Sequence, residues 1–215
     1  CGYRNGGLDM DKDTLLAIKN EYRDMINMLG HRVKVERLPV AHGEGLLCKW
    51  KFNVNAPSYY ISSKDDVDPK RTNNMVFYME LPNGFPKTAP KVYYPTDKML
   101  ASINVYRSGT QCIDTWYYDD THSGGNSSVK GVVKKTLLDI IHEPSVSNFN
   151  SQANSSLCSW QRTMNEKGLL PTCKASDGII KTERELMENN KKEKGVTPMP
   201  RSAAKHIVPM PGTRR

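Results

Sequence analysis

The sequence predicts an α+β domain with helices on one face of an antiparallel sheet and at its ends. Three observations support this class. An amphipathic helical pattern stands near the N-terminus, four short strand-like segments follow it, and helical periodicity returns after a long irregular segment. Strands grouped in the middle of a chain, with helices before and after them, are typical of α+β folds.

The first helix is predicted from about Met10 to Leu29. Its apolar residues recur at steps of three and four, which places them on one face of a helix, and Gly30 supplies a stop. This apolar face requires a sheet to pack against. The residues of the face are Leu15, Ile18, Tyr22, Met25, Ile26 and Leu29.

Four strands are predicted after this helix. Each segment is short, rich in β-branched or aromatic residues, and separated from the next by Gly, Pro, Asn or Asp, as an antiparallel meander requires. A polar hairpin loop, residues 62–73, is expected between the second and third strands. The predicted strands are residues 32–38, 46–54, 75–81 and 91–95.

Three further helices are predicted in the second half of the chain. The first begins at Val129, after the polar segment YYDDTHSGGNSS, and ends at His142, Glu143 and Pro144. The others are expected at about residues 152–165 and 179–192.

Composition narrows the class of protein. A chain of 215 residues with 37% hydrophobic and 25% charged residues is expected to bury one main core. Its apolar runs all fall short of the roughly 18 residues that cross a bilayer, and its first fifteen residues lack a signal-peptide pattern. We therefore expect a cytoplasmic protein with no membrane partner.

The five cysteines do not suggest a disulfide framework or a zinc site, because their number is odd and no CxxC pair occurs. Free thiols fit a reducing compartment. The sequence also has no compact cluster of metal ligands and no phosphate-binding glycine motif. We expect neither a metal nor a cofactor.

The two ends of the chain differ from its body. Residues 191–215 hold seven basic residues against Glu193, and so carry +6 of the formal net charge of +8. With four prolines and few large apolar residues, this basic tail is expected to be disordered. It is either a solvated extension or a contact for an anionic partner, and nucleic acid is not the expected one. Residues 1–9 are expected to form a flexible leader.

The segment INVYRSGTQCIDTW contains the candidate site. Asn104 stands eight positions before Cys112, Gly109 three before it and Asp114 two after. A thiolate is a good nucleophile and its thioester remains reactive toward nitrogen, whereas most cysteines are simply buried. Cys48 lies near Trp50 in a predicted strand and Cys158 near Trp160 in a predicted helix, so a packing role is a sufficient explanation for both cysteines.

These residues, with GFPKTAPKVYY before them and LLDIIHEPSVSNFN after them, resemble the core of a ubiquitin-conjugating enzyme. The resemblance covers roughly residues 10–165. It implies the ubiquitin-conjugating-enzyme fold and a catalytic domain over residues 10–167. A C-terminal helical extension is expected over residues 168–190. The family tripeptide His-Pro-Asn is here Ser-Ile-Asn, ending at Asn104. Ligase docking of the usual kind is not expected, because Lys87 replaces an aromatic residue and Gly124–Asn126 replaces Trp-Ser-Pro.

The resemblance implies roles for further residues. Cys112 would carry ubiquitin or a ubiquitin-like protein as a thioester, and Asn104 would donate to the oxyanion formed during amine attack or brace its own loop. Asn148 would orient the amine or cap a loop. Asp114 is expected to brace the loop, and His122 is not expected to act in catalysis.

An activating enzyme is the second partner that the resemblance implies. Lys12, Lys19 and Arg23 project beside the apolar face of the first helix, and activating enzymes recognise that helix partly through basic residues. A solvated charged face explains the same three residues equally well.

Two rival functions stay open at this point. One is a catalytically silent binding or scaffold module of the same fold, which would usually lack the cysteine. The other is a cysteine hydrolase that uses Cys112 with His122 or His142, although neither histidine stands in a recognisable motif.

Overall fold

The computed structural model describes residues 12–113, 116, 128–171 and 177–193. The predicted leader, Asp114, His122, the Gly124–Asn126 region and most of the basic tail lie outside the described residues. Residues 1–182 and 183–215 form two separate compact units. The first unit contains α1 (Lys12–Met28), β1 (Val33–Leu38), β2 (Leu46–Val54), β3 (Ser58–Ile61), β4 (Lys70–Thr72), β5 (Met75–Pro82), β6 (Lys91–Tyr93), β7 (Met99–Leu100), α2 (Val129–Ile140), η1 (Pro144–Val146), η2 (Ser155–Leu157) and α3 (Cys158–Glu166), and α4 (Glu183–Glu193) belongs to the second.

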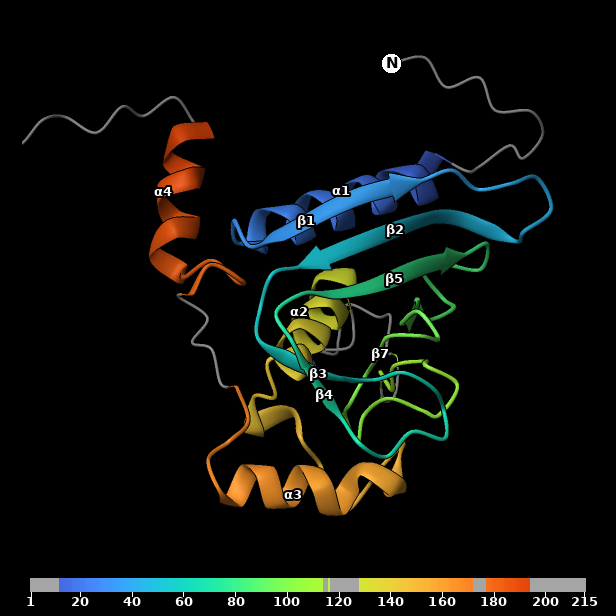
Figure 1. The fold of residues 1–215 in the computed structure, drawn as a ribbon. Coiled ribbons are helices and arrows are strands. Elements are labelled where there is room, and N and C mark those ends of the chain that lie inside the picture. Colours follow the sequence, from blue (N-terminus) through green and yellow to red (C-terminus); the bar gives the residue numbers. More distant parts are fainter. Residues whose placement is uncertain (1–11, 114–115, 117–127, 172–176, 194–215) are drawn as a thin grey trace, which may run out of the picture. The chain divides into compact units, whose positions relative to one another are not determined.

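The four predicted strands form one antiparallel sheet in the order β1-β2-β5-β6. Strands β1, β2 and β5 lie side by side in Figure 1. Side chains alternate along β2 and β5 between buried and partly exposed positions. The buried set includes Trp50, Phe52 and Phe77, and the rings of Phe52 and Phe77 stack with centroids 4.4 Å apart. The prediction of a four-stranded antiparallel sheet in an α+β fold is confirmed.

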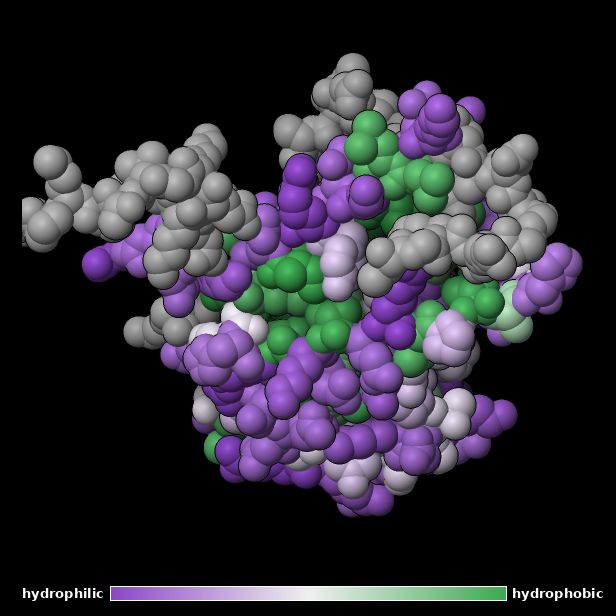
Figure 2. Space-filling view, turned by 90° about the horizontal axis from the view of Figure 1, so that it is seen from above, coloured by the Kyte–Doolittle hydropathy of each residue, from purple (hydrophilic) through white to green (hydrophobic). Residues whose placement is uncertain are grey.

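Helix α1 follows its predicted register, but its burial increases along its length. Met25, Met28 and Leu29 are buried, whereas Leu15 and Leu16 are 41% and 56% exposed. Tyr22 stacks on Trp50 of β2 at 5.7 Å, so the C-terminal half of the helix is the part anchored in the core. In the view from above in Figure 2, apolar residues on the surface lie directly beside strongly hydrophilic residues.

A second, three-stranded sheet has the order β4-β3-β7. The expected loop over residues 62–73 is therefore wrong at its C-terminal end, where β4 pairs with β3 as the second arm of a hairpin. The prediction missed this because strands of two to four residues are too short for a visible alternating pattern. Ser58 in β3 donates to the carbonyl of Ile140 at 2.6 Å, which joins this sheet to the end of α2.

Residues after α3 also contribute to the first unit. The amides of Gly30 and Arg32 donate to the carbonyls of Ile179 and Gly178, and the side chain of Ile179 is fully buried. A Cβ atom at Gly30 would lie 2.1 Å from the Gly178 carbonyl oxygen, so the predicted helix stop is also a point of close backbone approach. The first unit thus extends to residue 182, well past residue 167.

Two helices begin later than predicted. Helix α3 starts at Cys158, after the 3-10 turn η2, and not at residue 152. Helix α4 starts at Glu183 and not at residue 179, because residues 179–181 form a backbone bridge with residues 28–30 at the end of α1.

Candidate active site around Cys112

Cys112 closes a short hairpin that begins at Asn104. Val105 and Gln111 pair across the hairpin, the amide of Tyr106 donates to the Thr110 carbonyl at 2.8 Å, and the amide of Cys112 donates to the Asn104 carbonyl at 2.7 Å. Each of these pairs lies in one antiparallel register. The eight-residue spacing therefore makes Asn104 and Cys112 cross-strand neighbours, and we call residues 104–112 the cysteine hairpin.

The turn of the cysteine hairpin depends on Gly109. Its amide donates to the Tyr106 carbonyl at 2.8 Å, and its φ of +82° is a conformation that residues with a Cβ adopt rarely. A Cβ at this position would also lie 3.2 Å from both the Met99 sulfur and the Tyr94 carbonyl oxygen. Glycine at position 109 therefore has a structural cause in this turn.

The second arm of the hairpin is held at the edge of the four-stranded sheet. The amide of Tyr94 donates to the Gly109 carbonyl and the amide of Gln111 donates to the Val92 carbonyl, both at 2.9 Å. The tip is held separately: Arg107 forms an ion pair with Asp65 at 2.9 Å, between β3 and β4. The segment immediately before Cys112 is therefore held by hydrogen bonds to the sheet edge and, at the tip of the hairpin, by the Arg107–Asp65 ion pair.

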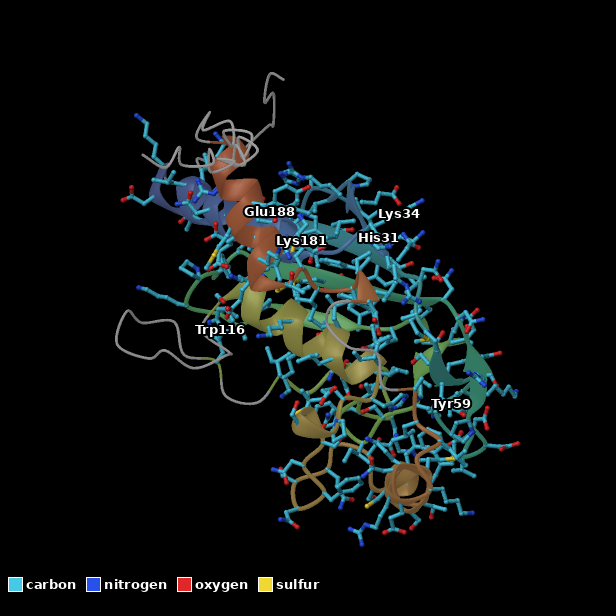
Figure 3. The ribbon with its side chains drawn as sticks, turned by 90° about the vertical axis from the view of Figure 1, so that its left-hand side faces the viewer. His31, Lys34, Tyr59, Trp116, Lys181 and Glu188 are labelled. Atoms are coloured by element: carbon cyan, nitrogen blue, oxygen red, sulfur yellow. The ribbon has the colours of Figure 1, made fainter. Side chains whose placement is uncertain are left out.

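The Cys112 side chain is half-buried, and the hydroxyl of Tyr106 donates to its Sγ at 3.7 Å. Tyr106 itself is 46% exposed. Trp116, four residues beyond Cys112, packs against Phe85 and donates from its indole nitrogen to the Pro86 carbonyl at 2.9 Å. The Trp116 side chain is labelled in Figure 3. Tyr106 was missed from the sequence, although a hairpin register would have placed it near the cysteine.

The side chain of Asn104 is 6% exposed and serves as a brace. Its Nδ2 donates to Asp139 Oδ1 at 3.1 Å and to the Val146 carbonyl at 2.9 Å, so both amide hydrogens have acceptors within the protein. Of the two predicted roles, this geometry supports bracing. A donor role toward an oxyanion would require one of these bonds to be released.

Asp139 is a buried carboxylate beneath the cysteine hairpin that the sequence prediction did not identify. It lies on α2, it is fully buried, and it accepts hydrogen bonds from Ser102, Asn104 and Gln111. Burial raises its pKa, and the three hydrogen bonds oppose this effect. An aspartate between Leu138 and Ile140 in an otherwise apolar stretch was the available signal.

The remaining predicted site residues are exposed. Asn148 caps its own loop, because its Oδ1 accepts from the Asn150 amide at 3.0 Å, which matches the loop-capping alternative. Lys12, Lys19 and Arg23 are exposed on α1, and Arg23 lies 3.4 Å from Asp24. They form a basic surface distant in sequence from the cysteine hairpin.

Cys48 and His142 are poor reactive groups in their observed environments. Cys48 is 2% exposed, and burial raises the pKa of its thiol to about 12, which leaves little nucleophilic thiolate at neutral pH. His142 is 1% exposed and packs edge-to-face against Tyr59 and Trp160, at 6.1 and 6.0 Å. Both residues act as core packing.

No family model matches the chain, and no curated protein matches it.

Among the described residues, no group of three or more His, Cys, Asp or Glu side chains is arranged to hold a metal ion. None of the helices in the described part of the chain is both long enough and apolar enough to span a bilayer.

Proposed function

We propose that the protein is a transferase of the ubiquitin-conjugating type, which carries the C-terminus of ubiquitin or a ubiquitin-like protein on Cys112. The observation that carries this proposal is the cysteine hairpin. A half-buried thiol follows a segment held at the sheet edge and lies across the hairpin from a buried asparagine. A fixed cysteine with an open side suits the approach of an extended peptide C-terminus.

The reaction consists of two acyl transfers. In the first, the Cys112 thiolate attacks the carbonyl carbon of a modifier held as a thioester on an activating enzyme, and the activating enzyme's thiol leaves. In the second, an amine attacks the carbonyl carbon of the Cys112 thioester. The new C–N bond replaces the C–S bond, Cys112 leaves as a thiolate, and the attacking nitrogen releases one proton to solvent.

The contrast with Cys48 supports the assignment to Cys112. Both thiols lie in the same domain, but Cys48 is packed into the sheet with its pKa raised to about 12, whereas Cys112 is partly accessible and contacts a hydroxyl donor. Nucleophilic cysteines require thiolate character together with access. Between these two thiols, Cys112 meets the requirement of access.

Within this proposal Asn104 shapes the site and Tyr106 faces its reactive atom. The amide of Asn104 is engaged with Asp139 and Val146, while the Tyr106 hydroxyl donates to the sulfur that is acylated. A hydroxyl donor stabilises negative charge on a leaving thiolate. The basic surface formed by Lys12, Lys19 and Arg23 is the proposed contact for the activating enzyme.

The test of this function is a charging reaction. The protein is incubated with ATP, candidate ubiquitin-like modifiers and their activating enzymes, and the products are separated by electrophoresis without reductant. The proposal predicts an adduct with one modifier that disappears on addition of thiol. Failure of every pair to give a thiol-sensitive adduct would contradict transfer and favour the binding or scaffold alternative.

A further inference from the structure

The two arms of the cysteine hairpin are tied to a single buried carboxylate. Asp139 Oδ1 accepts from Asn104 Nδ2 at 3.1 Å on the first arm, and Asp139 Oδ2 accepts from Gln111 Nε2 at 2.8 Å on the second arm. Gln111 is the residue immediately before Cys112. Asp139 on α2 therefore holds two residues next to Cys112: Asn104, which faces it across the hairpin, and Gln111, which precedes it in the chain.

The hydrogen-bond pattern suits an ionised carboxylate. Ser102 Oγ also donates to Oδ1, at 2.7 Å, so three donors converge on two carboxylate oxygens. The amide of Gln111 is oriented from its other end, because its Oε1 accepts from the Tyr94 hydroxyl at 3.0 Å. With Gln111 held in this orientation, only an acceptor at position 139 satisfies its Nε2.

We propose that Asp139 is the positioning residue of the site: it clamps Asn104 and Gln111, and thereby fixes the main chain at Cys112. Loss of its acceptor oxygen on either arm would loosen the hairpin, which the main-chain bonds to Val92 and Tyr94 still hold at the sheet edge. The clamp acts through these neighbours and does not touch the reacting atoms. Its catalytic consequence rests on the proposed function, whereas its effect on the hairpin does not.

The titratable surroundings of Asp139 give the clamp a dependence on pH. Burial raises its pKa, and the bonds from Gln111, Ser102 and Asn104, with Lys135 on its own helix, oppose that effect. Tyr94, behind Gln111, is held neutral because burial raises its pKa well above the usual value. As pH falls through the pKa of Asp139, protonation turns one acceptor into a donor, and the clamp weakens at a pH above the usual range for aspartate.

A reciprocal exchange of the two side chains tests the clamp. Asp139→Asn places two amide groups nitrogen to nitrogen, and Gln111→Glu places two carboxylates together, so each single variant breaks the contact. In the double variant the new amide at position 139 donates to the new carboxylate at position 111. The amide oxygen at position 139 still accepts from Ser102 and Asn104, and the carboxylate at position 111 still accepts from Tyr94. Every hydrogen bond of the parent network is thus restored with the charge moved across it.

Amide hydrogen exchange in the full chain measures the clamp directly. The reporter amides are Cys112 and Tyr106, which form the hairpin's own bonds, and the amide of Phe52 in the core is the internal control. We expect each single variant to lose protection at the reporters by roughly tenfold to a hundredfold, as for a buried donor left without its acceptor. The double variant should return to within about twofold of the parent.

Two results would overturn the clamp: parent-like protection in Asp139→Asn, or a double variant no better protected than the singles. If the single variants do not fold, a pH series on the parent replaces them, and reporter protection that stays constant while Asp139 protonates would overturn it. The rate of thioester discharge to lysine, measured in the same four proteins, tests catalysis separately. A clamp seen by exchange without any charging would refute the proposed function alone.

Discussion

Buried His142 makes the stability of the protein sensitive to pH. Its ring is 1% exposed between Tyr59 and Trp160, and neither ring nitrogen has a hydrogen-bond partner among the described residues. Burial therefore lowers its pKa from 6.5 to about 4. Between these two values the unfolded chain binds a proton that the native protein excludes, so the free energy of unfolding decreases as the pH falls.

The expected loss of stability follows from the two pKa values. It begins near pH 6.5 and reaches about 3 kcal/mol once the pH is below both values. At pH 5 the loss attributable to this one histidine is about 2 kcal/mol. That is a large fraction of the 5–15 kcal/mol that stabilises a typical domain, where about 1 kcal/mol is already measurable.

The assay is urea unfolding at pH 7.5 and pH 5.0, followed by tryptophan fluorescence. The test variant is His142→Asn, because asparagine does not titrate in this range and tolerates the φ of +54° found at this position. Its absolute stability will fall through lost packing, but its pH difference should be smaller than the parent's by about 2 kcal/mol. The control is His42→Asn at an exposed site, which should keep the parent's pH difference. Equal pH differences in the parent and in His142→Asn would refute the reasoning.

Three further predictions concern the cysteine hairpin and α1. Gly109→Ala should destabilise the protein by more than Gly43→Ala in urea unfolding. Both glycines have a positive φ, and a Cβ in that conformation alone costs about 1–2 kcal/mol. Only at Gly109 would the added Cβ also crowd neighbouring atoms. Equal losses would show that crowding is unimportant. Asn104→Ala should slow loading and discharge together, because a brace positions Cys112 in both reactions; normal loading with slow discharge would instead indicate that Asn104 donates to the oxyanion. Replacing the three basic α1 residues with Glu should slow charging but change the melting temperature little, because exposed charges contribute little to folding. Charging at the parent rate in low salt would show that the activating enzyme binds a different surface.

Periodicity was sufficient to predict α1, α2 and the main sheet. Alternation is strong along β2 and β5 because one face of each strand lies in the core, and the apolar spacing of α2 survives for the same reason. Segments joined by non-local pairing were not predictable in this way. Residues 178–181 are in the first unit because they pair with the end of α1, and no local pattern encodes that partner.

The candidate site was predicted in part. The spacing of Asn104 and Cys112 drew attention to the right segment, and the hairpin register explains that spacing. The support beneath it was missed, because Asp139 comes from a helix distant in sequence and an isolated acidic residue in an apolar stretch has many explanations. Buried polar networks of this kind are specified by three-dimensional proximity, which a linear pattern does not contain.

The most direct test of the central proposal is to locate the bond that holds the modifier. The charged protein is digested under acidic, non-reducing conditions, and mass spectrometry should find the modifier's C-terminal residue on the peptide that contains Cys112. Cys112→Ser should replace the thiol-sensitive adduct with an oxyester that resists thiol and is cleaved by base, whereas Cys48→Ser and Cys158→Ser should still charge through the thiol. A thiol-sensitive adduct that persists in Cys112→Ala would contradict the assignment of Cys112 as the carrier.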